Sequence, residues 1–447
     1  MRPMEAFSFV EGPFEENVIR KTFQMPKFRT LLKNKNFVLY SIGQAFSQFG
    51  DRLVQILLIG LVYKRYPGSS LQLAKLFCFT VLPSFFLSPV AGVYIDRWNK
   101  KYVMMISDIF RAVAILLVPV IFIYRESIVP IYAIIFFVFA AACFFLPARL
   151  AVIPGLVPKE NLLLANSANS ITWVIAGITG FSLGGVLAEW IGIKNGLYLN
   201  ALVYFLSAAS FLMLAFSVKK RTQDAPGPRE PVDVTKILKK SFLDDFKEGL
   251  KVLFLDKKIR FVAFTFFLFS SMIGALYVVG VVFIQDVMRS MTKDIGIFAM
   301  FLFIGLLVGS YMYGKTGKKF HRTKTVFASV FLTGLSIDAF VVGLKAMQSF
   351  WFGNAAMFCL GLFISPVYVT ANTIIHETIE SRLGGRVFSS IGIIINIGFL
   401  SFMFISSTLA EYVGRFWVLV FCGTLFSIFG IVNLIAEFLK KENTTFS

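Results

Sequence analysis

The chain has 447 residues, of which 57% are hydrophobic and only 15% are charged, and its formal net charge is +19. So apolar a composition excludes a soluble globular protein of this size and indicates a protein of the lipid bilayer. The positive charge lies mostly between the apolar stretches, as in the loops of membrane proteins, so we expect no nucleic-acid partner.

Apolar stretches of about 20 residues, the length that crosses roughly 30 Å of hydrocarbon, recur along the chain. They predict an all-α membrane protein with twelve transmembrane helices in two halves of six. The predicted spans are 37–62, 73–95, 102–124, 131–146, 167–187, 196–216, 261–284, 295–313, 325–344, 350–370, 387–409 and 416–438.

The longest polar break separates the two halves. We therefore predict an N-terminal tail (1–36), a first six-helix bundle (37–217), a linker (218–260), a second bundle (261–438) and a C-terminal tail (439–447). Placing both tails in the cytoplasm puts most Lys and Arg residues on the inner side, as the positive-inside rule requires. Residues 1–36 are polar and charged, so we expect the first helix to act as an uncleaved anchor.

Ionisable residues inside the hydrocarbon are costly, so each is a candidate functional residue. Asp51 and Arg52 lie near the middle of the first predicted span. A carboxylate in this place can take up and release a proton as water reaches it from one side and then the other. The alternative is a neutral or paired Asp51 that only orients helices.

A charged hairpin joins the second and third spans, with the sequence Gly92-Val93-Tyr94-Ile95-Asp96-Arg97-Trp98-Asn99-Lys100-Lys101. It resembles the signature loop of the major facilitator superfamily of transporters. A related stretch begins at Ser310, close to half the chain length later, with Lys315, Lys318 and Lys319 in place of Arg97, Lys100 and Lys101. The recurrence indicates a parallel internal repeat.

The hairpin is a candidate gate. Gly92 permits close helix approach, and Asp96 is placed to pair with the amino end of a helix from the other half. The position matching Asp96 in the second half is Gly314, so we predict an asymmetric gate.

Two further spans carry acids. Asp108 and Arg111 stand three residues apart near the cytoplasmic end of the third span, where we expect a structural or gating role together with the hairpin charges. Asp338, deep in the ninth span, is a secondary candidate for proton coupling. Residues 147–166 and 366–386 both run from a helix end into a polar loop before the next span, which is a second resemblance between the halves.

The fifth span contains small residues at intervals that let two helices touch. It is similar to the antiporter motif of superfamily exporters. Ala176 stands in place of the first glycine and Phe181 in place of the proline, and the other small positions are Gly180, Gly184 and Gly185. Because the missing proline removes the expected kink, generic helix packing stays an equal alternative to an antiport signature.

The linker contains an apolar stripe at three- and four-residue spacing from Val234 to Leu253, with lysines between. We predict an amphipathic helix on the inner membrane surface; the alternative is a solvated tether.

The chain offers no expected enzyme, metal or cofactor site. The four cysteines stand singly in different spans, and no HExxH, GxSxG or P-loop pattern occurs. We therefore expect a protein that is not an enzyme and needs no cofactor.

Several local patterns resemble one branch of the superfamily, the bacterial exporters that include macrolide efflux proteins and the enterobactin exporter. They are Ser47-Gln48-Phe49-Gly50-Asp51-Arg52, Ser107-Asp108-Ile109-Phe110-Arg111-Ala112, Pro147-Ala148-Arg149 and Gly385-Arg386-Val387-Phe388-Ser389. The resemblance implies a proton-coupled exporter of a small amphiphile in the bacterial inner membrane, working by alternating access. We expect membrane lipids as surroundings and a monomer. A lysophospholipid or lipid-precursor carrier, and a non-transporting scaffold or sensor on the same fold, remain as alternatives.

Overall fold

Long helices account for nearly all of the chain that the computed structural model describes, residues 28–95, 98–124, 127–214, 257–317, 321–378 and 384–443. Twelve of the helices in these ranges are long and apolar enough to cross a membrane, which confirms the predicted fold class. The first half contains α3 (Lys35–Arg65), α4 (Ser70–Ile95), α5 (Lys100–Tyr124), α6 (Val129–Leu156), α7 (Leu162–Trp190) and α8 (Gly192–Leu212). The second half contains α11 (Lys257–Met288), α12 (Lys293–Thr316), α13 (Arg322–Met347), α14 (Phe350–Thr378), α15 (Gly384–Val413) and α16 (Arg415–Asn443).

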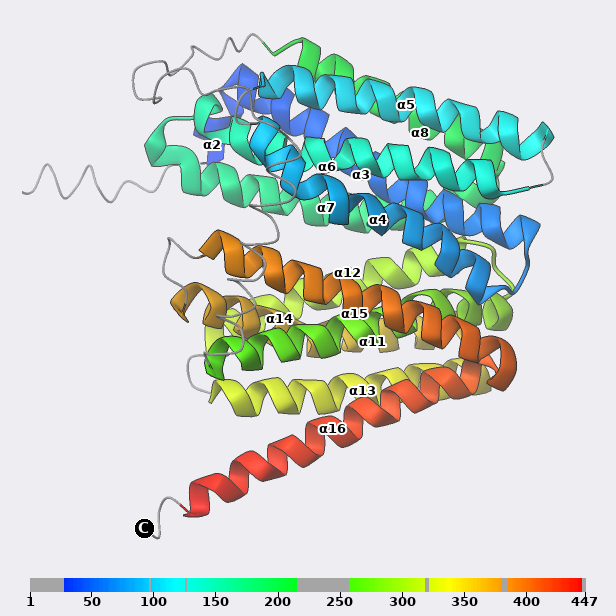
Figure 1. Ribbon diagram of the computed structural model, residues 1–447, viewed down its shortest axis with the longest axis vertical. Helices are drawn as coiled ribbons and strands as arrows, with labels where there is room; N and C mark the ends of the chain where they lie inside the picture. Colours follow the sequence, from blue (N-terminus) through cyan, green and yellow to red (C-terminus); the bar gives the residue numbers. More distant parts are fainter. Residues whose placement is uncertain are drawn as a thin grey trace, which may run out of the picture.

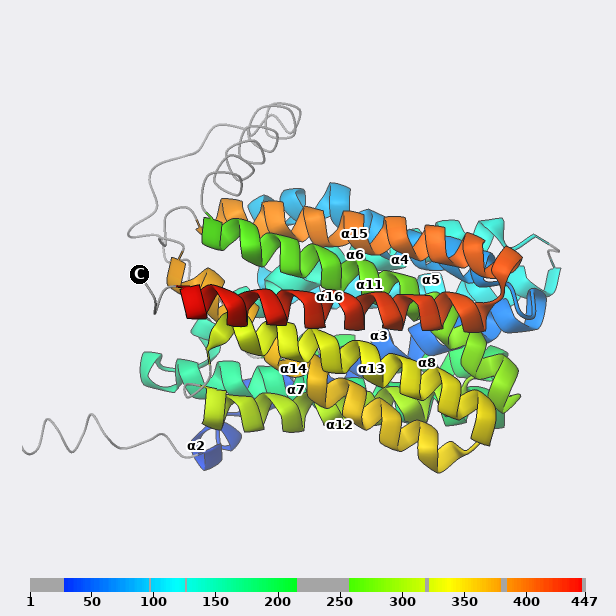
Figure 2. The ribbon, with the colours of Figure 1, turned by 90° about the horizontal axis from the view of Figure 1, so that it is seen from below.

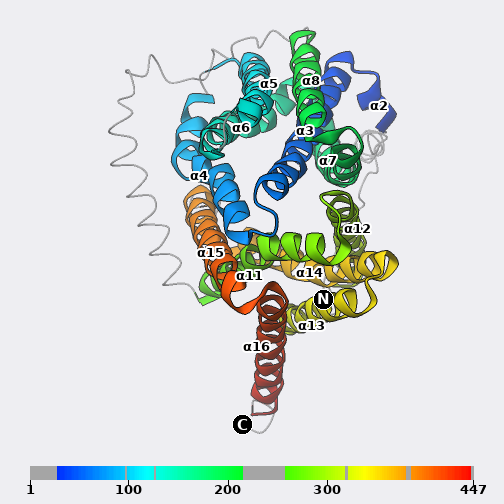
Figure 3. The same cartoon turned by 90° about the vertical axis from the view of Figure 1, so that its right-hand side faces the viewer.

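The helices run roughly parallel to one another, and the short helix α2 (Phe28–Leu32) and the carboxyl end of α16 lie at the same end of the bundle (Figures 1 and 2). We call this the terminal end and the opposite one the far end. Seen along the bundle, α3 to α8 and α11 to α16 form two groups (Figure 3). The groups meet mainly where α7 packs on α12 and α4 packs on α15.

The two halves turn in the same way at the far end. Gly68 and Arg289 both adopt left-handed backbone conformations between the first and second helices of their halves. Gly192 and Gly414 do so between the fifth and sixth helices. The members of each pair stand 221 and 222 residues apart, so the turns fix the register of the internal repeat.

The fourth and tenth helices are longer than the predicted spans, which end at residues 146 and 370. The helix α6 continues through Pro147 and Pro154 to Leu156, and α14 continues through Pro366 to Thr378. Proline removes one backbone hydrogen bond, but ending the helix inside a membrane would leave several backbone groups without partners. The extra turns of α6 also bury Ala148, Val152 and Ile153 in an apolar cluster with the start of α3.

Close contact between α11 and α15 depends on a missing side chain. A Cβ atom at Gly274 would overlap the carbonyl oxygen of Phe399, whereas a Cβ atom at Gly280, on the same helix, would meet no heavy atom within 4 Å.

We therefore expect Gly274→Ala to lower the free energy of unfolding by about 1–3 kcal/mol through overpacking. Gly280→Ala should leave it unchanged or raise it slightly, because alanine favours helix. Thermal unfolding of both variants in detergent measures the difference, and equal midpoints would contradict this account of the α11–α15 contact.

Candidate functional site

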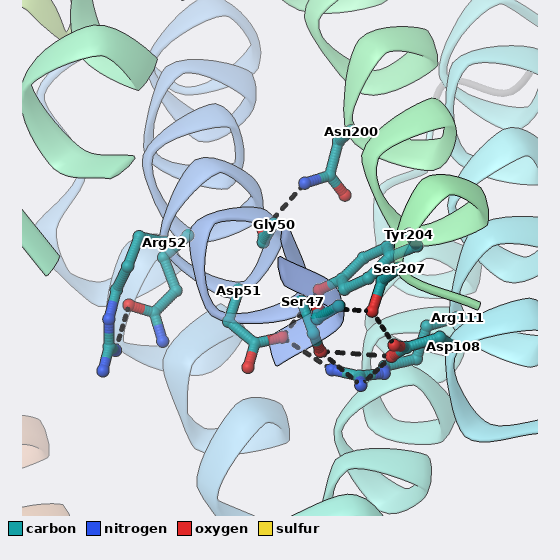
Figure 4. Close-up of polar contacts among 11 residues, drawn as sticks. Ser47, Gly50, Asp51, Arg52, Asp108, Arg111, Asn200, Tyr204 and Ser207 are labelled. Atoms are coloured by element: carbon teal, nitrogen blue, oxygen red, sulfur yellow. Dashed lines mark hydrogen bonds and ion pairs between the residues drawn. The ribbon is translucent and has the colours of Figure 1, made fainter. Parts of the chain in front are cut away.

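Asp51 lies at the centre of the first transmembrane helix and is held by two other helices. Its Oδ1 atom accepts hydrogen bonds from Arg111 Nη1 on α5 at 2.7 Å and from the Tyr204 hydroxyl on α8 at 2.8 Å (Figure 4). The side chain of Asp51 is 23% exposed, while that of Arg111 is fully buried. Asp51 is therefore the member of this pair that water can reach.

A second carboxylate, Asp108, shares the same guanidinium and is completely buried. Its Oδ1 accepts from Arg111 Nη2 and from Ser47 Oγ at 3.2 Å, and its Oδ2 accepts from Ser207 Oγ at 2.5 Å. Arg111 Nη2 also donates to Ser47 Oγ at 3.0 Å. These bonds offset the cost of removing three charges from water, which is high for any group left unpaired.

Aromatic rings complete the surroundings of Arg111. Its guanidinium carbon lies 4.7 Å from the ring centres of both Phe145 and Tyr204, within the range of cation–π attraction. We call Ser47, Asp51, Asp108, Arg111, Tyr204 and Ser207 the charge cluster. It joins α3, α5 and α8 through polar contacts near the middle of these helices.

Sequence spacing predicts only part of this cluster. The pairing of Asp108 with Arg111 follows from their three-residue separation, but the bond from Arg111 to Asp51 depends on how α5 packs on α3. Sequence reasoning missed Tyr204 and Ser207. Their signal is the polar character of Asn200, Tyr204 and Ser207 at helical spacing in an otherwise apolar span; Asn200 donates to the carbonyl of Gly50 at 2.7 Å.

Arg52 points away from the charge cluster, toward α7. Its Nη1 donates a long hydrogen bond of 3.4 Å to Gln55, and its guanidinium lies 5.5 Å from the ring centre of Trp173 and 5.7 Å from that of Phe181. A Cβ atom at Gly180 would stand 2.5 Å from Cβ of Arg52. The glycine thus makes room for the arginine stem.

The other small residues of α7 face two neighbours. A Cβ atom at Gly184 would press on Ile56 of α3, at 2.9 Å, while one at Gly185 would stand 2.6 Å from the carbonyl oxygen of Thr292, at the start of α12. Ala176 is buried on the same helix. Small residues therefore let α7 touch α3 in its own half and α12 in the other.

A further cation, Arg149 on α6, is 6% exposed, and its Nε and Nη1 atoms are buried without a hydrogen-bond partner among the residues that the structure describes. Its backbone carbonyl accepts from the Tyr40 hydroxyl at 3.1 Å. Ionised Asp51 and Asp108 balance the charges of Arg111 and Arg149. A proton taken up by this group of four residues leaves an excess of positive charge.

Asp338 lies apart from the charge cluster, between α13 and α16. Its Oδ2 accepts from Thr424 Oγ1 at 3.1 Å, and its Oδ1 is buried without a partner. Among the described residues no cation forms an ion pair with it, so its surroundings differ from those of Asp51.

At the far end the halves are joined by two glutamates in equivalent places. Glu189, at the end of α7, accepts through Oε1 from Ser290 Oγ and from the backbone amides of Thr292 and Lys293, each at 2.9 Å. Since the side chain of Thr292 does not cap α12, a residue of the first half caps this helix of the second.

Glu411, at the end of α15, accepts from Ser69 Oγ at 3.2 Å. Glu411 follows Glu189 by 222 residues, and Ser290 follows Ser69 by 221, so the two Glu–Ser contacts are repeats of one another. We call them the far-end latches. Arg415, bound to the carbonyl of Gly68 and to Asp286, reinforces the second latch.

Comparison with known proteins identifies the family. The model of the Major Facilitator Superfamily matches residues 40–399. The chain belongs to this superfamily. Within it, the chain is 26% identical to the uncharacterised MFS-type transporter YkuC of Bacillus subtilis strain 168 over 361 residues, which are 80% of this chain and 81% of YkuC.

Other relatives of this Major Facilitator Superfamily protein are exporters by name. Macrolide efflux protein A of Streptococcus pyogenes is 26% identical over 409 residues, 89% of this chain and 95% of that protein. Among solved structures, the nucleoside transporter NupG aligns with a TM-score of 0.66 at 13% identity, over 90% of this chain and 99% of NupG. A bacterial homologue of the iron transporter ferroportin gives the same score at 16% identity, with coverage of 90% and 99%. These structures show that the fold is shared.

The signature hairpin of the superfamily falls partly outside the described residues. Asp96 and Arg97 lie outside them, as do Lys318 and Lys319 of the repeat and the predicted linker helix at 234–253. Gly92 lies in α4. Lys100 and Lys101 begin α5, and Lys101 Nζ donates to the carbonyl of Leu214 at 2.7 Å.

Removing the shared cation tests the energetics of the charge cluster. Arg111→Met leaves two carboxylates without their partner, so we expect a loss of about 3–5 kcal/mol in the free energy of unfolding. The triple variant Asp51→Asn, Asp108→Asn, Arg111→Met should recover at least half of it. Thermal unfolding in detergent gives the comparison, with Lys194→Met, an exposed change at the far end, as the control. A triple variant no more stable than the single one would show that burial of the charges is not the cause.

Proposed function

We propose that this superfamily member is a proton-coupled exporter of a small amphiphilic compound in the bacterial inner membrane, acting as a monomer with both termini in the cytoplasm. The observation that carries the proposal is the place of Asp51, a partly exposed carboxylate at the centre of α3 that shares Arg111 with buried Asp108. The macrolide efflux relative supports export, and the basic loops of the terminal end support the orientation.

Proton uptake at Asp51 would change what holds the first half together. A neutral Asp51 loses its ion pair with Arg111, which keeps Asp108, Ser47 and the two rings as partners. A proton can therefore shift the balance between two conformations by the difference in its affinity for them.

The surface between the halves suits an apolar ligand. Phe77 of α4 packs edge-on against Tyr277 of α11, with ring centres 4.9 Å apart, and Phe181 of α7 stacks on Phe303 of α12 at 5.9 Å. The guanidinium of Arg52 lies beside this aromatic surface, 5.7 Å from the ring centre of Phe181. An amphiphile can place its apolar part against the rings and its polar part near Arg52 and Asp51.

The far-end latches are closed in this structure, so we assign it to the state whose opening faces the terminal end. In the opposite state the latches must separate. The hairpin residues Gly92, Asp96, Arg97, Lys100 and Lys101 are then the counterpart at the terminal end, and Asp108 and Arg111 link that end to the proton site.

A compound screen comes first as the test of transport. We expect at least one compound, with macrolides as the starting set, to accumulate less in cells that overproduce the protein than in cells that lack it. A protonophore should abolish the difference. A scaffold or sensor would give no flux with any compound.

Asp51→Asn is expected to keep the fold and ligand binding but to abolish gradient-driven efflux, because the amide keeps hydrogen bonds and cannot carry the proton. Efflux is followed from about pH 6 to 8. Asp338→Asn should leave a smaller effect, because Asp338 lies apart from Arg111. An Asp51→Asn variant with parental efflux at every pH would reject the coupling role.

Glu189→Ala is expected to favour opening at the far end by about 1–2 kcal/mol, because α12 loses its cap. Glu411→Ala should act in the same direction but less, because Glu411 accepts one hydrogen bond. The measure is labelling of single cysteines placed at each end in a background without native cysteines. Glu160→Ala, at the terminal end, is the control. Unchanged far-end labelling in both latch variants would contradict the role.

Asp96→Ala is expected to shift the same equilibrium the other way, toward the state open at the terminal end, by about 1–2 kcal/mol. The same cysteine pairs report it. Labelling at the terminal end equal to that of the parent would leave the hairpin without a latch role.

A further inference from the structure

A cavity of about 140 Å³ lies on the outer side of the second half, between α11, α13 and α16 and away from the surface between the halves. Its walls are almost wholly apolar, with Thr265 and Asn433 as the polar exceptions. The lining residues are Phe264, Thr265, Leu268, Phe269, Val326, Phe327, Val330, Phe426, Phe429 and Asn433.

The cavity follows from the course of α16 and from rigid rings around it. Toward its carboxyl end α16 slants away from α13 and the rest of the bundle (Figures 1 and 3). Phe429 of α16 touches Phe264 of α11 and Phe327 of α13, with ring centres 6.2 and 6.1 Å apart. These three rings bridge the diverging helices and leave space behind them.

The cavity opens to the hydrocarbon. Phe264, at its edge, is 50% exposed, whereas Val326 and Val330, deeper in the wall, are 1% and 3% exposed. Apolar cavities of roughly this size stay dry and accept an apolar molecule as large as benzene. In a membrane, the apolar groups available to fill such a cavity are lipid acyl chains.

Cations stand at the terminal end of the same helix faces. Arg260 precedes Phe264 by one helical turn, and Arg322 precedes Val326 by one turn and Val330 by two, which places these cations about 6–12 Å from the cavity walls along the helix axes. Both arginines are exposed. Lys324 adds a third cation, and Glu437, four residues after Asn433, adds an acid.

We propose that the cavity between α11, α13 and α16 binds one acyl chain of an anionic phospholipid whose phosphate is held by Arg260 and Arg322. The chain fills the space behind the three rings, and the headgroup lies at the terminal end, where basic residues between helices favour anionic lipid. A bound lipid would brace α16 against α11 and α13. The site is separate from the proposed transport pathway.

The test compares lipids with identical chains and different headgroups. Full-length protein in detergent is titrated with phosphatidylglycerol or phosphatidylcholine, and binding is followed by native mass spectrometry and by the unfolding midpoint. We expect the parent to bind phosphatidylglycerol more tightly and to be stabilised by it. Each lost cation should weaken that binding about fivefold.

Three variants separate the parts of the site. Arg260→Gln with Arg322→Gln should bring phosphatidylglycerol down to the level of phosphatidylcholine, and Val330→Trp, which fills the cavity, should weaken binding of both lipids. Lys194→Gln, the same charge change at an exposed site of the far end, should change nothing. The double arginine variant leaves the interior unchanged, so it still measures the headgroup preference if Val330→Trp fails to fold.

Two results would overturn the proposal. If the double arginine variant prefers phosphatidylglycerol as strongly as the parent does, the proposed headgroup site is wrong. Displacement of bound lipid by an exported compound, with no headgroup preference, would assign the cavity to substrate. Loss of efflux without loss of lipid binding concerns the transport proposal alone.

Discussion

The sharing of one guanidinium by two carboxylates is the constraint on which the first half depends. Arg111 is fully buried and binds Asp51 on α3 and Asp108 on its own helix, and neither acid has another cation bonded to it among the described residues. Such an arrangement is stable only when every member keeps its partners. The consequence is that α3, α5 and α8 form one unit, and that a change in charge at Asp51 is felt by all three helices.

The polar contacts between the halves at the far end are of a different kind. They join helix ends through hydrogen bonds rather than through a shared charge. The carboxylate of Glu189 replaces a missing cap of α12, so closing the far end also completes a helix. Under the proposed alternating access, the far-end latches are the contacts that separate, while the charge cluster keeps α3, α5 and α8 together.

Much of the fold could be predicted from the sequence. The length and hydropathy of the apolar stretches predict the membrane helices, and the recurrence of the charged hairpin predicts the internal repeat. The full lengths of α6 and α14 could not be predicted, since burial of Ala148 and Val152 outweighs one lost hydrogen bond. The sequence identifies Asp51 and Arg111 as charges that are costly inside a membrane. It does not predict the ion pair between them, because residue spacing indicates neighbours on one helix and not contacts between two helices. The contacts of Glu189 and Glu411 could not be predicted either, because acids near loops are common and the sequence does not identify their partners.

The far-end latches are present in both halves, whereas the charge cluster is present only in the first. The Glu–Ser pairs recur with an offset of 221 and 222 residues, yet the same offset of 221 takes Asp51 to Met272, Asp108 to Ser329 and Arg111 to Leu332. The register therefore keeps the far-end latches in both halves and the charge cluster only in the first. Under the proposed coupling at Asp51, residues of the second half that face the transported compound can differ without altering the charge cluster.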